Sequence, residues 1–509
     1  MNEIIIDGNS LTIEDVIMVA RNGYKVKISE EAEKKVVKAR NLVDKFVKEG
    51  RVEYGITTGF GKFADVVISK ENTKQLQKNL IMSHACGVGD ELPHEVVRAA
   101  MLLRANALAK GYSGIRLSTL KTLIDMLNKD VCPVIYEKGS LGASGDLAPL
   151  AHMVLTMLGE GEAYYNGKRM PSIDAMKAAK IDTVELVEKE GLALINGTPI
   201  MTAIASLAVY DAVNLSKAAD ITGSMTVEAL RGITDAYYYR VNEVRPQVGQ
   251  MACAKNLLRI LKGSSLTTKQ GELRVQDAYT LRCIPQIHGA SKDAINYAKN
   301  VVEIEINSAT DNPLIFEDEE KVISGGNFHG QPIALAMDFL GIAVAELADV
   351  SERRIERLVN YQLNDLPPFL TKEGGLNSGF MITQYVAASL VSENKVLAHP
   401  ASVDSIPSSA NQEDHVSMGT IAARKCRDII YNVTRVLGIE YLADSQALYF
   451  RGNVKLGEGT EKAYELIRSE IKPFDEDRIM YPEINKASDL VSSGKLVKVV
   501  EDKIGELNN

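Results

Sequence analysis

The chain has 509 residues and a net charge of −9, with 45% hydrophobic and 25% charged residues. No block of Lys and Arg interrupts the interspersed charges, which argues against nucleic acid or another polyanion as a partner and favours a small molecule. The five cysteines are scattered without a CxxC pair, and the N-terminus lacks the basic start and apolar stretch of a signal peptide, so we expect a protein of the reducing cytoplasm.

Helical periodicity dominates the predicted elements. In Ser29 to Glu49, apolar residues recur every three or four positions, with Ser29 as N-cap and Gly50 as C-terminal stop. The clearest strand signal is Glu162 to Arg169, where Asn166-Gly167 predicts a type I′ hairpin turn. From Pro199 onward, segments rich in Ala, Leu and Ile predict a bundle of long helices, at 199–215, 333–359, 380–396 and 418–440.

The most apolar long run is Ile333 to Val350. It carries Asp338, Glu346 and Asp349, and carboxylates are costly inside a lipid bilayer. The run is therefore predicted to be a core helix, and we expect no membrane partner.

The elements together predict a mainly α fold, with a long-helix bundle as its core and a smaller N-terminal α+β portion. We expect an N-terminal domain of residues 1–195 and a central and C-terminal helix bundle of residues 196–509, with the boundary near 185–198. Gly-rich segments between helices are the expected places for a site, at 55–61, 139–145, 325–330 and 373–379.

The most informative segment runs from Gly139 to His152 and contains Ala143-Ser144-Gly145-Asp146-Leu147. One interpretation is a turn before a helix, with Ser144 or Asp146 as N-cap. In the other, the Gly145 amide nitrogen attacks the Ala143 carbonyl and closes a five-membered ring around Ser144. Loss of two waters then leaves 4-methylidene-imidazole-5-one (MIO), and small residues at 143 and 145 permit the required bend.

These residues resemble the motif from which the aromatic amino-acid ammonia-lyases and aminomutases make MIO. Further motifs of that family recur in order along almost the whole chain: Tyr54 to Gly61, Asn196 to Pro199, Gln276 to Gln286, Thr310 to Pro313, Gly325 to Gly330 and Asn411 to His415. The resemblance implies an ammonia-lyase with a fumarase/aspartase-like helix bundle. It also implies a homotetramer in which each site is shared between subunits.

The resemblance also assigns roles to single residues. It implies that Tyr54 is a catalytic base, that Arg282 binds the substrate carboxylate through its bidentate fork, and that Tyr279 assists at the reacting centre. If their segment is helical, Tyr279 and Arg282 share a face. The positions that resemble the lining of the MIO group are Asn196, Gln276 and Phe328. Asp146 either assists cyclisation or caps a helix.

Two positions point to the substrate. Ser83-His84 and Glu413 resemble the members of the family that act on histidine. His84 and Glu413 offer hydrogen-bond partners to an imidazole, whereas a phenyl ring would leave them desolvated and unpaired. We therefore expect conversion of L-histidine to trans-urocanate and ammonia, the first step of histidine degradation. Glu413 is also a second candidate for the base that takes the β-proton.

Several alternatives stay open. Thr57 stands where the members that act on histidine commonly have Asn. This substitution is the one sequence feature that favours a tyrosine or phenylalanine ammonia-lyase, or a 2,3-aminomutase. A scaffold without activity would need neither Ser144 nor Tyr54. A lyase of the fumarase type would need a GSSxMPxKxN loop, which the sequence lacks. Because the spacing gives no HxH or HExxH group, we expect no catalytic metal at His152, His329, His399 or His415.

Overall fold

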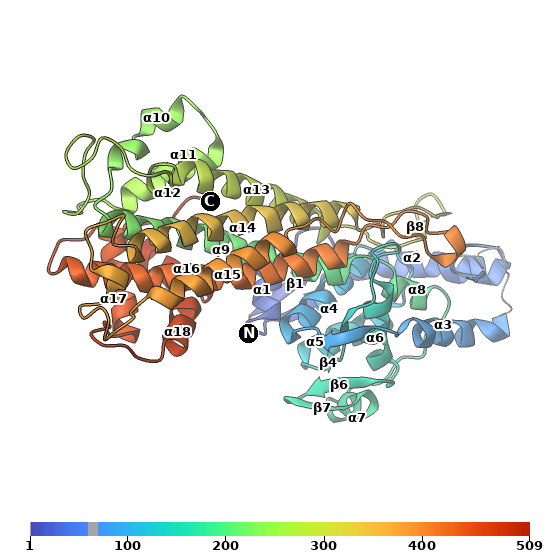
Figure 1. Ribbon diagram of the computed structural model, residues 1–509. Helices are drawn as coiled ribbons and strands as arrows, with labels where there is room; N and C mark the ends of the chain where they lie inside the picture. The colour runs from blue at the N-terminus through green and yellow to red at the C-terminus, as the bar shows by residue number, and fades with distance from the viewer. Residues whose placement is uncertain (1, 60–69) are drawn as a thin grey trace. The chain divides into compact units, whose positions relative to one another are not determined.

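A computed structural model of the chain describes residues 2–59 and 70–509 (Figure 1). The chain forms two compact units, each assembled from three stretches of sequence. Unit 1 comprises Met1–Tyr210, Lys299–Asp338 and Pro400–Arg424, and unit 2 comprises Asp211–Ala298, Phe339–His399 and Lys425–Asn509. The predicted domains, 1–195 and 196–509, are a different division of the chain and stay a prediction.

Unit 1 combines helices with short strands. Its elements are β1 (Glu3–Ile6), α1 (Ile13–Ala20), β2 (Lys25–Ile28), α2 (Glu30–Glu49), α3 (Lys70–His84), β3 (Val88–Glu91), α4 (His94–Ala109), α5 (Leu117–Asn128), β4 (Cys132–Pro133), β5 (Tyr136–Lys138), α6 (Leu147–Met157), β6 (Glu162–Tyr165), β7 (Lys168–Pro171), α7 (Ser172–Ala178), α8 (Glu190–Ile195), β8 (Leu314–Phe316), β9 (Lys321–Ile323) and η4 (Ser409–Asn411). The strands form small sheets: parallel β1-β2, and antiparallel β3-β5, β4-β6-β7 and β8-β9.

Unit 2 is almost entirely helical. Its elements are η2 (Thr234–Tyr237), α10 (Tyr239–Glu243), α11 (Val248–Ile260), α12 (Tyr279–Arg282), η3 (Pro368–Leu370), α15 (Met381–Leu397), α17 (Glu458–Glu470), α18 (Tyr481–Ser492) and α19 (Lys495–Ile504). Four long helices contain residues of both units: α9 (Pro199–Ala229), α13 (Ile284–Glu305), α14 (Gln331–Val359) and α16 (Gly419–Arg451). The predicted mainly α fold, with long helices and a smaller α+β portion, is confirmed.

Local signals in the sequence explain two elements directly. The Ser29 hydroxyl accepts the Ala32 amide at the start of α2, and Gly50 ends this helix in the left-handed region at φ 70°. Asn166 and Gly167 both have positive φ between the paired strands β6 and β7, as a type I′ turn requires. Both predictions are confirmed.

Helix α2 also supports the loop that carries Tyr54. Its buried residues Val43 and Phe46 pack in one apolar cluster with Ile56 of that loop and Ile315 of β8. The cluster anchors the loop through side chains that are almost completely buried.

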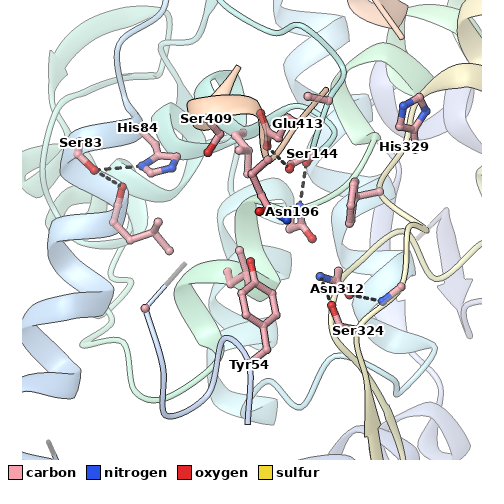
Figure 2. Close-up of a pocket in the computed structure, with 18 of the residues that line it drawn as sticks. Tyr54, Ser83, His84, Ser144, Asn196, Asn312, Ser324, His329, Ser409 and Glu413 are labelled. Atoms are coloured by element: carbon pink, nitrogen blue, oxygen red, sulfur yellow. Dashed lines mark hydrogen bonds between the residues drawn. The ribbon is translucent and has the colours of Figure 1, made fainter. Parts of the chain in front are cut away.

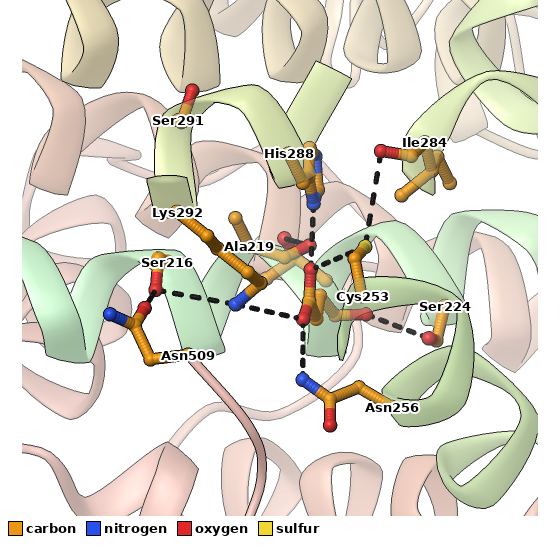
Figure 3. Close-up of polar contacts among 12 residues, drawn as sticks. Ser216, Ala219, Ser224, Cys253, Asn256, Ile284, His288, Ser291, Lys292 and Asn509 are labelled. Carbon is orange, nitrogen blue, oxygen red and sulfur yellow. Dashed lines mark hydrogen bonds and ion pairs between the residues drawn. The ribbon is translucent and has the colours of Figure 1, made fainter. Parts of the chain in front are cut away.

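The helix bundle of unit 2 contains a buried polar network centred on Asp220 of α9 (Figure 3). One carboxylate oxygen lies 2.8 Å from His288 Nδ1 of α13, and the other lies 3.1 Å from Lys292 Nζ and accepts a bond from Asn256 of α11. Burial raises the pKa of Asp220, but Lys292 and His288 outweigh this effect and hold it at about 2. The network thus links three helices through a buried carboxylate whose negative charge is balanced by Lys292.

Among the described residues, α9 is the one helix whose length and composition would allow it to cross a membrane. Most of its apolar stretch is buried inside the protein, so this pattern is weak evidence for a span. The run from Ile333 to Val350 is helical, within α14, as predicted.

Candidate active site

A cavity of about 1040 Å³ lies within unit 1 and brings together residues from distant parts of the chain (Figure 2). Seven of the predicted site residues line it: Tyr54, His84, Ala143, Ser144, Asn196, Phe328 and Glu413. The other described residues of its wall are Gly59, Leu76, Asn79, Leu80, Ser83, Leu147, Leu192, Asn312, Ser324, Gly325, His329, Ser409, Gln412, Asp414 and His415.

Ser144 stands on a tight turn directly before α6. Gly142 and Gly145 flank it with φ values of 66° and 72°, a region that favours glycine. Ala143 is buried against Val416 and Met418, which leaves little space for a larger side chain. The turn thus has a small residue on each side of Ser144.

Gly145 lies directly against the backbone of Gly197, in the Asn196 to Pro199 segment. A Cβ atom at Gly145 would lie 1.9 Å from the Gly197 carbonyl oxygen, and one at Gly197 would lie 2.0 Å from the Thr310 carbonyl oxygen. The Asp146 amide donates to the Gly197 carbonyl over 2.7 Å, which fixes the two segments side by side. The glycines of two predicted motifs are therefore needed for close approach of backbones.

Asp146 is fully buried and anchors this turn to the start of α9. One carboxylate oxygen accepts the amides of Ile200 and Met201, at 3.0 and 2.9 Å, and the other accepts the hydroxyls of Ser140 and Thr420. The side chain makes no capping bond to α6, the helix that it precedes. Instead, it binds the first turn of α9, where the positive end of the helix dipole stabilises a carboxylate. Burial nevertheless raises the pKa of Asp146.

Two polar side chains hold Ser144 itself. The Asn196 amide donates to the Ser144 carbonyl oxygen over 2.8 Å, and the Ser144 hydroxyl donates to Glu413 Oε1 over 2.6 Å. The second oxygen of Glu413 accepts the Ser408 hydroxyl over 2.7 Å. Figure 2 shows Glu413 and Asn196 on either side of Ser144.

His84 ends α3 and faces the same cavity. The Ser83 hydroxyl donates to the Leu80 carbonyl oxygen over 3.1 Å and lies 3.0 Å from His84 Nδ1, where its lone pair can accept the Nδ1 proton. In this arrangement Nε2 keeps a lone pair for a ligand. Burial lowers the pKa of His84, although the backbone of Leu80 and the charge of Glu413 oppose the shift, so a neutral imidazole is favoured at neutral pH.

Tyr54 belongs to a loop on another side of the cavity, with its ring pointing towards the region of Asn196 and Ser144 (Figure 2). In this loop, the Thr57 hydroxyl donates to the Arg51 carbonyl and accepts the Glu53 amide, so it is used within the loop and does not line the cavity. Phe60 and Gly61, which complete the predicted motif, lie outside the described residues.

Another wall contains residues of three segments that the sequence motifs had singled out, 310–313, 325–330 and 411–415. The Asn312 side chain accepts the Gly325 amide over 2.7 Å and lies 3.3 Å from the Ser324 hydroxyl. His329 stacks on His415, with ring centroids 5.8 Å apart. Phe328, which directly precedes His329 in the chain, also lines the cavity.

Four predicted site residues do not line this cavity: Gly145, which packs against Gly197 behind Ser144, and three residues of unit 2. Gln276, Tyr279 and Arg282 belong to unit 2, where Gln276 is exposed and Tyr279 is 68% exposed. Tyr279 and Arg282 share the short helix α12, and the Arg282 guanidinium stacks over the Tyr279 ring at 4.5 Å. The expected shared face is confirmed.

The sequence motifs missed Ser408 and Ser140, whose hydroxyls position the carboxylates of Glu413 and Asp146. Ser140 could have been suggested by its place in the Gly-rich turn, whereas nothing in the sequence marks Ser408. In the described part of the chain, the three ligand-type side chains close enough to hold a metal together are Asp220, Cys253 and His288. Because Lys292 and Asn256 already occupy Asp220, this cluster is a satisfied polar network.

Comparison with known proteins assigns the chain to a family. The family model for aromatic amino acid lyases matches residues 11–469. The chain belongs to the aromatic amino acid lyase family. The predicted family and the prediction of a lyase are thereby confirmed. Histidine ammonia-lyase of Caldanaerobacter subterraneus subsp. tengcongensis is 65% identical over 503 residues, which cover 99% of each chain.

Solved structures agree with this assignment. The crystal structure of histidine ammonia-lyase from Trypanosoma cruzi has a TM-score of 0.93 and 42% identity, over 99% of this chain and 96% of that one. Tyrosine aminomutase from Streptomyces globisporus has a TM-score of 0.96 and 37% identity, over 99% of this chain and all of that one. The fold alone therefore does not distinguish a histidine from a tyrosine substrate, or ammonia elimination from an aminomutase reaction. The residues of the cavity must decide between them.

Proposed function

We propose that the protein is a histidine ammonia-lyase that eliminates ammonia from L-histidine to give trans-urocanate. The observation that carries the proposal is the joint presence of Ser144, His84 and Glu413 in one cavity. Ser144 can supply an electrophile, and the other two side chains can pair with an imidazole. The names of the relatives, which are histidine ammonia-lyases at 57–66% identity, support the same substrate.

The turn at Ser144 fits the formation of MIO. Ring closure joins the Gly145 nitrogen to the Ala143 carbonyl carbon, and the carbonyl oxygen leaves as water with the amide protons of Ser144 and Gly145. A second water carries away the Ser144 hydroxyl and the α-proton. The positive φ of Gly145, the small Ala143 and the bond from Asn196 to the Ser144 carbonyl all suit this ring. When formed, MIO would supply an electrophilic methylidene carbon, the chemistry needed to make the substrate amine a better leaving group.

Substrate choice rests on the polar pair in the cavity. A neutral His84 presents the lone pair of a ring nitrogen, and Glu413 presents a carboxylate oxygen, so an imidazolium, which donates from both ring nitrogens, can satisfy both while a phenyl ring cannot. Sites built on such contacts reject apolar analogues by roughly 10⁴-fold or more. Tyr54 and Glu413 both face the cavity, and either can take the β-proton of the substrate.

The carboxylate of the substrate needs a cation, for which Arg282 is suited by its bidentate fork. Because Arg282, Tyr279 and Gln276 belong to unit 2 and do not line the cavity in unit 1 of their own chain, we propose that they serve the site of another subunit in a homotetramer. Exposed apolar residues on the helices of unit 2 support such assembly, among them Tyr385, Ile382 and Tyr431. We further propose a cytoplasmic enzyme without a catalytic metal.

Ammonia-lyase activity on tyrosine or phenylalanine, or a 2,3-aminomutase activity, is the second candidate because tyrosine aminomutase shares the fold at a TM-score of 0.96. Its sequence support was Thr57, whose hydroxyl bonds the backbone of its own loop. Thr57 is therefore not placed to select a substrate ring, and His84 and Glu413 carry more weight.

The test is ultraviolet absorbance at the urocanate band, with L-histidine, L-tyrosine and L-phenylalanine offered separately to the wild type and to Ser144→Ala. We expect urocanate from L-histidine alone, without added cofactor, and none from the variant. A cinnamate-type product from tyrosine or phenylalanine would favour the second candidate, as would a β-amino acid, which lacks a conjugated double bond and is detected by chromatography of the reaction mixture. No product from any of the three substrates would refute the ammonia-lyase proposal.

A further inference from the structure

The bond between Ser144 and Glu413 suggests a role for Glu413 before the first turnover. The Ser144 hydroxyl is the group that must leave when the methylidene forms. It lies 2.6 Å from Glu413 Oε1, a distance suited to direct proton transfer. Resting on the proposed function, we propose that Glu413 is a catalytic residue of MIO formation, donating the proton with which the Ser144 hydroxyl leaves as water.

The step is balanced within the chain and its solvent. Glu413 first takes up a proton from solvent through the cavity and passes it to Ser144 Oγ, which turns its hydrogen bond with Glu413 around; the Cβ–Oγ bond then breaks and one water departs. The electron pair of the Cα–H bond becomes the Cα=Cβ double bond, and the α-proton passes to water. Glu413 is again a carboxylate at the end, so the chain loses one water and is neither oxidised nor reduced.

Asp146 is another carboxylate near the turn, but its hydrogen bonds make it unsuited to this step. Its two oxygens accept four donors, from Ile200, Met201, Ser140 and Thr420, and it is fully buried. The two bonds of Glu413 come instead from Ser144, the leaving group, and from Ser408. Glu413 also lines the cavity, which gives its proton access to solvent.

Ser408 is a positioning residue for Glu413. The Ser408 hydroxyl donates to Glu413 Oε2 over 2.7 Å, and the backbones of the two residues pair with each other in both directions, which closes a short loop. Within this loop Ser409, Ala410 and Asn411 have φ values of 52°, 53° and 64°, all in the left-handed region. Such strain in three consecutive residues persists only where the surrounding contacts fix the loop. The loop directs Oε1 of Glu413 at Ser144.

The two dehydrations can be followed separately by mass. The wild type, Glu413→Gln and Ser408→Ala are made in a pulse of cell-free synthesis, and the masses of the chain and of the peptide containing Ser144 are recorded over time. Asp404→Asn is the matched control, because Asp404 is an exposed acid of the same segment that does not line the cavity. Circular dichroism checks that each variant is folded.

We expect the wild type and Asp404→Asn to lose two waters at the same rate. Glu413→Gln should lose the first water but lose the second about 100-fold more slowly or worse, so that a singly dehydrated chain accumulates. Ser408→Ala should show the same intermediate with a smaller delay, roughly fivefold to tenfold. A merely structural role would slow both losses together.

The inference is overturned if folded Glu413→Gln loses both waters at the wild-type rate, or if it loses neither. Failure of the proposed function gives a different result, because the wild-type chain itself would then keep its full mass.

Discussion

At the scale of single residues, Gly145 combines two requirements that occur separately elsewhere in the chain. Its φ of 72° lies in the left-handed region, and its α-carbon lies against the Gly197 carbonyl. Gly167 has almost the same φ, 73°, but nothing lies within 4 Å of the place where its Cβ would be. Comparing Gly145 with Gly167 therefore separates the free-energy cost of the left-handed conformation from that of the steric contact with Gly197.

We predict that Gly145→Ala prevents the loss of two waters and destabilises the protein by more than Gly167→Ala does. The left-handed conformation costs an alanine about 1–2 kcal/mol at either position, and overpacking adds roughly 1–3 kcal/mol or more at Gly145. Intact mass and denaturant unfolding measure the two effects. Equal stability of the variants, with MIO formed in both, would contradict the role assigned to the Gly197 contact.

His84 offers a test of substrate choice. We expect His84→Leu to lower kcat/KM for L-histidine roughly 10- to 100-fold, because one ring nitrogen of the substrate would stay unpaired in the cavity at a cost of about 1–3 kcal/mol. MIO formation, followed by mass, should be unchanged, since Ser144 is held by Asn196 and Glu413. Exposed Cys86, two residues further, provides the control Cys86→Ala. An unaltered preference for histidine over tyrosine would remove His84 from the specificity determinants.

At the scale of the elements, the polar network of Asp220 holds α9, α11 and α13 together. We predict that Lys292→Met destabilises the protein by about 3–5 kcal/mol, because it leaves a buried carboxylate without its main countercharge. Lys299→Met on the same helix is the control, since its ion pairs are at 3.6 Å and partly exposed, and it should cost about 1 kcal/mol or less. Denaturant midpoints measure both.

The same prediction has a pH dependence. The pKa of Asp220 is about 2 in the folded protein and about 3.9 in an unfolded chain, so its stabilising contribution is complete above pH 4 and is lost as the pH falls towards 2. The difference between wild type and Lys292→Met should shrink over that window. The double variant with Asp220→Asn should recover part of the loss, and strict additivity would show that the two residues are not coupled.

The polar network of Asp220 also explains why the sequence did not predict the full length of α9. Helix α2 was predicted with its ends and the β6-β7 hairpin with its turn, because Ser29, Gly50 and Asn166-Gly167 act locally. The predicted segment 199–215 ends before the real end of α9 at Ala229. Its second half contains buried polar residues such as Asp220 and Glu228, whose partners lie far away in sequence, so apolar periodicity cannot detect it.

The site shows the same division. Ser144, His84 and Glu413 could be selected by motif, and they do line one cavity. The contact between Ser144 and Glu413 spans 269 residues of sequence, and the alignment of Ser408 behind Glu413 depends on a loop of unusual backbone conformation. Neither contact follows from local propensity, because both are set by the tertiary structure.

At the scale of the whole molecule, the distribution of the site residues has a consequence for assembly. Tyr54 lines the cavity of unit 1, while Tyr279 and Arg282 lie on α12 of unit 2 and do not line it. If the proposed homotetramer shares its sites, a complete site takes Tyr54 from one subunit and Arg282 from another. Two variants that are each inactive can then complement each other within one oligomer.

We predict that co-expression of Tyr54→Phe and Arg282→Met restores part of the activity, although each variant alone is nearly inactive. In mixed tetramers some sites receive both wild-type residues, whereas sites built within one subunit would never contain both. Different affinity tags on the two chains allow mixed tetramers to be isolated, and urocanate formation measures their activity. Mixing the separately purified homotetramers without exchange is the control, and it should stay inactive. Isolated mixed tetramers without activity would show that Tyr54 and Arg282 act in the same chain or that one of them is not part of the site.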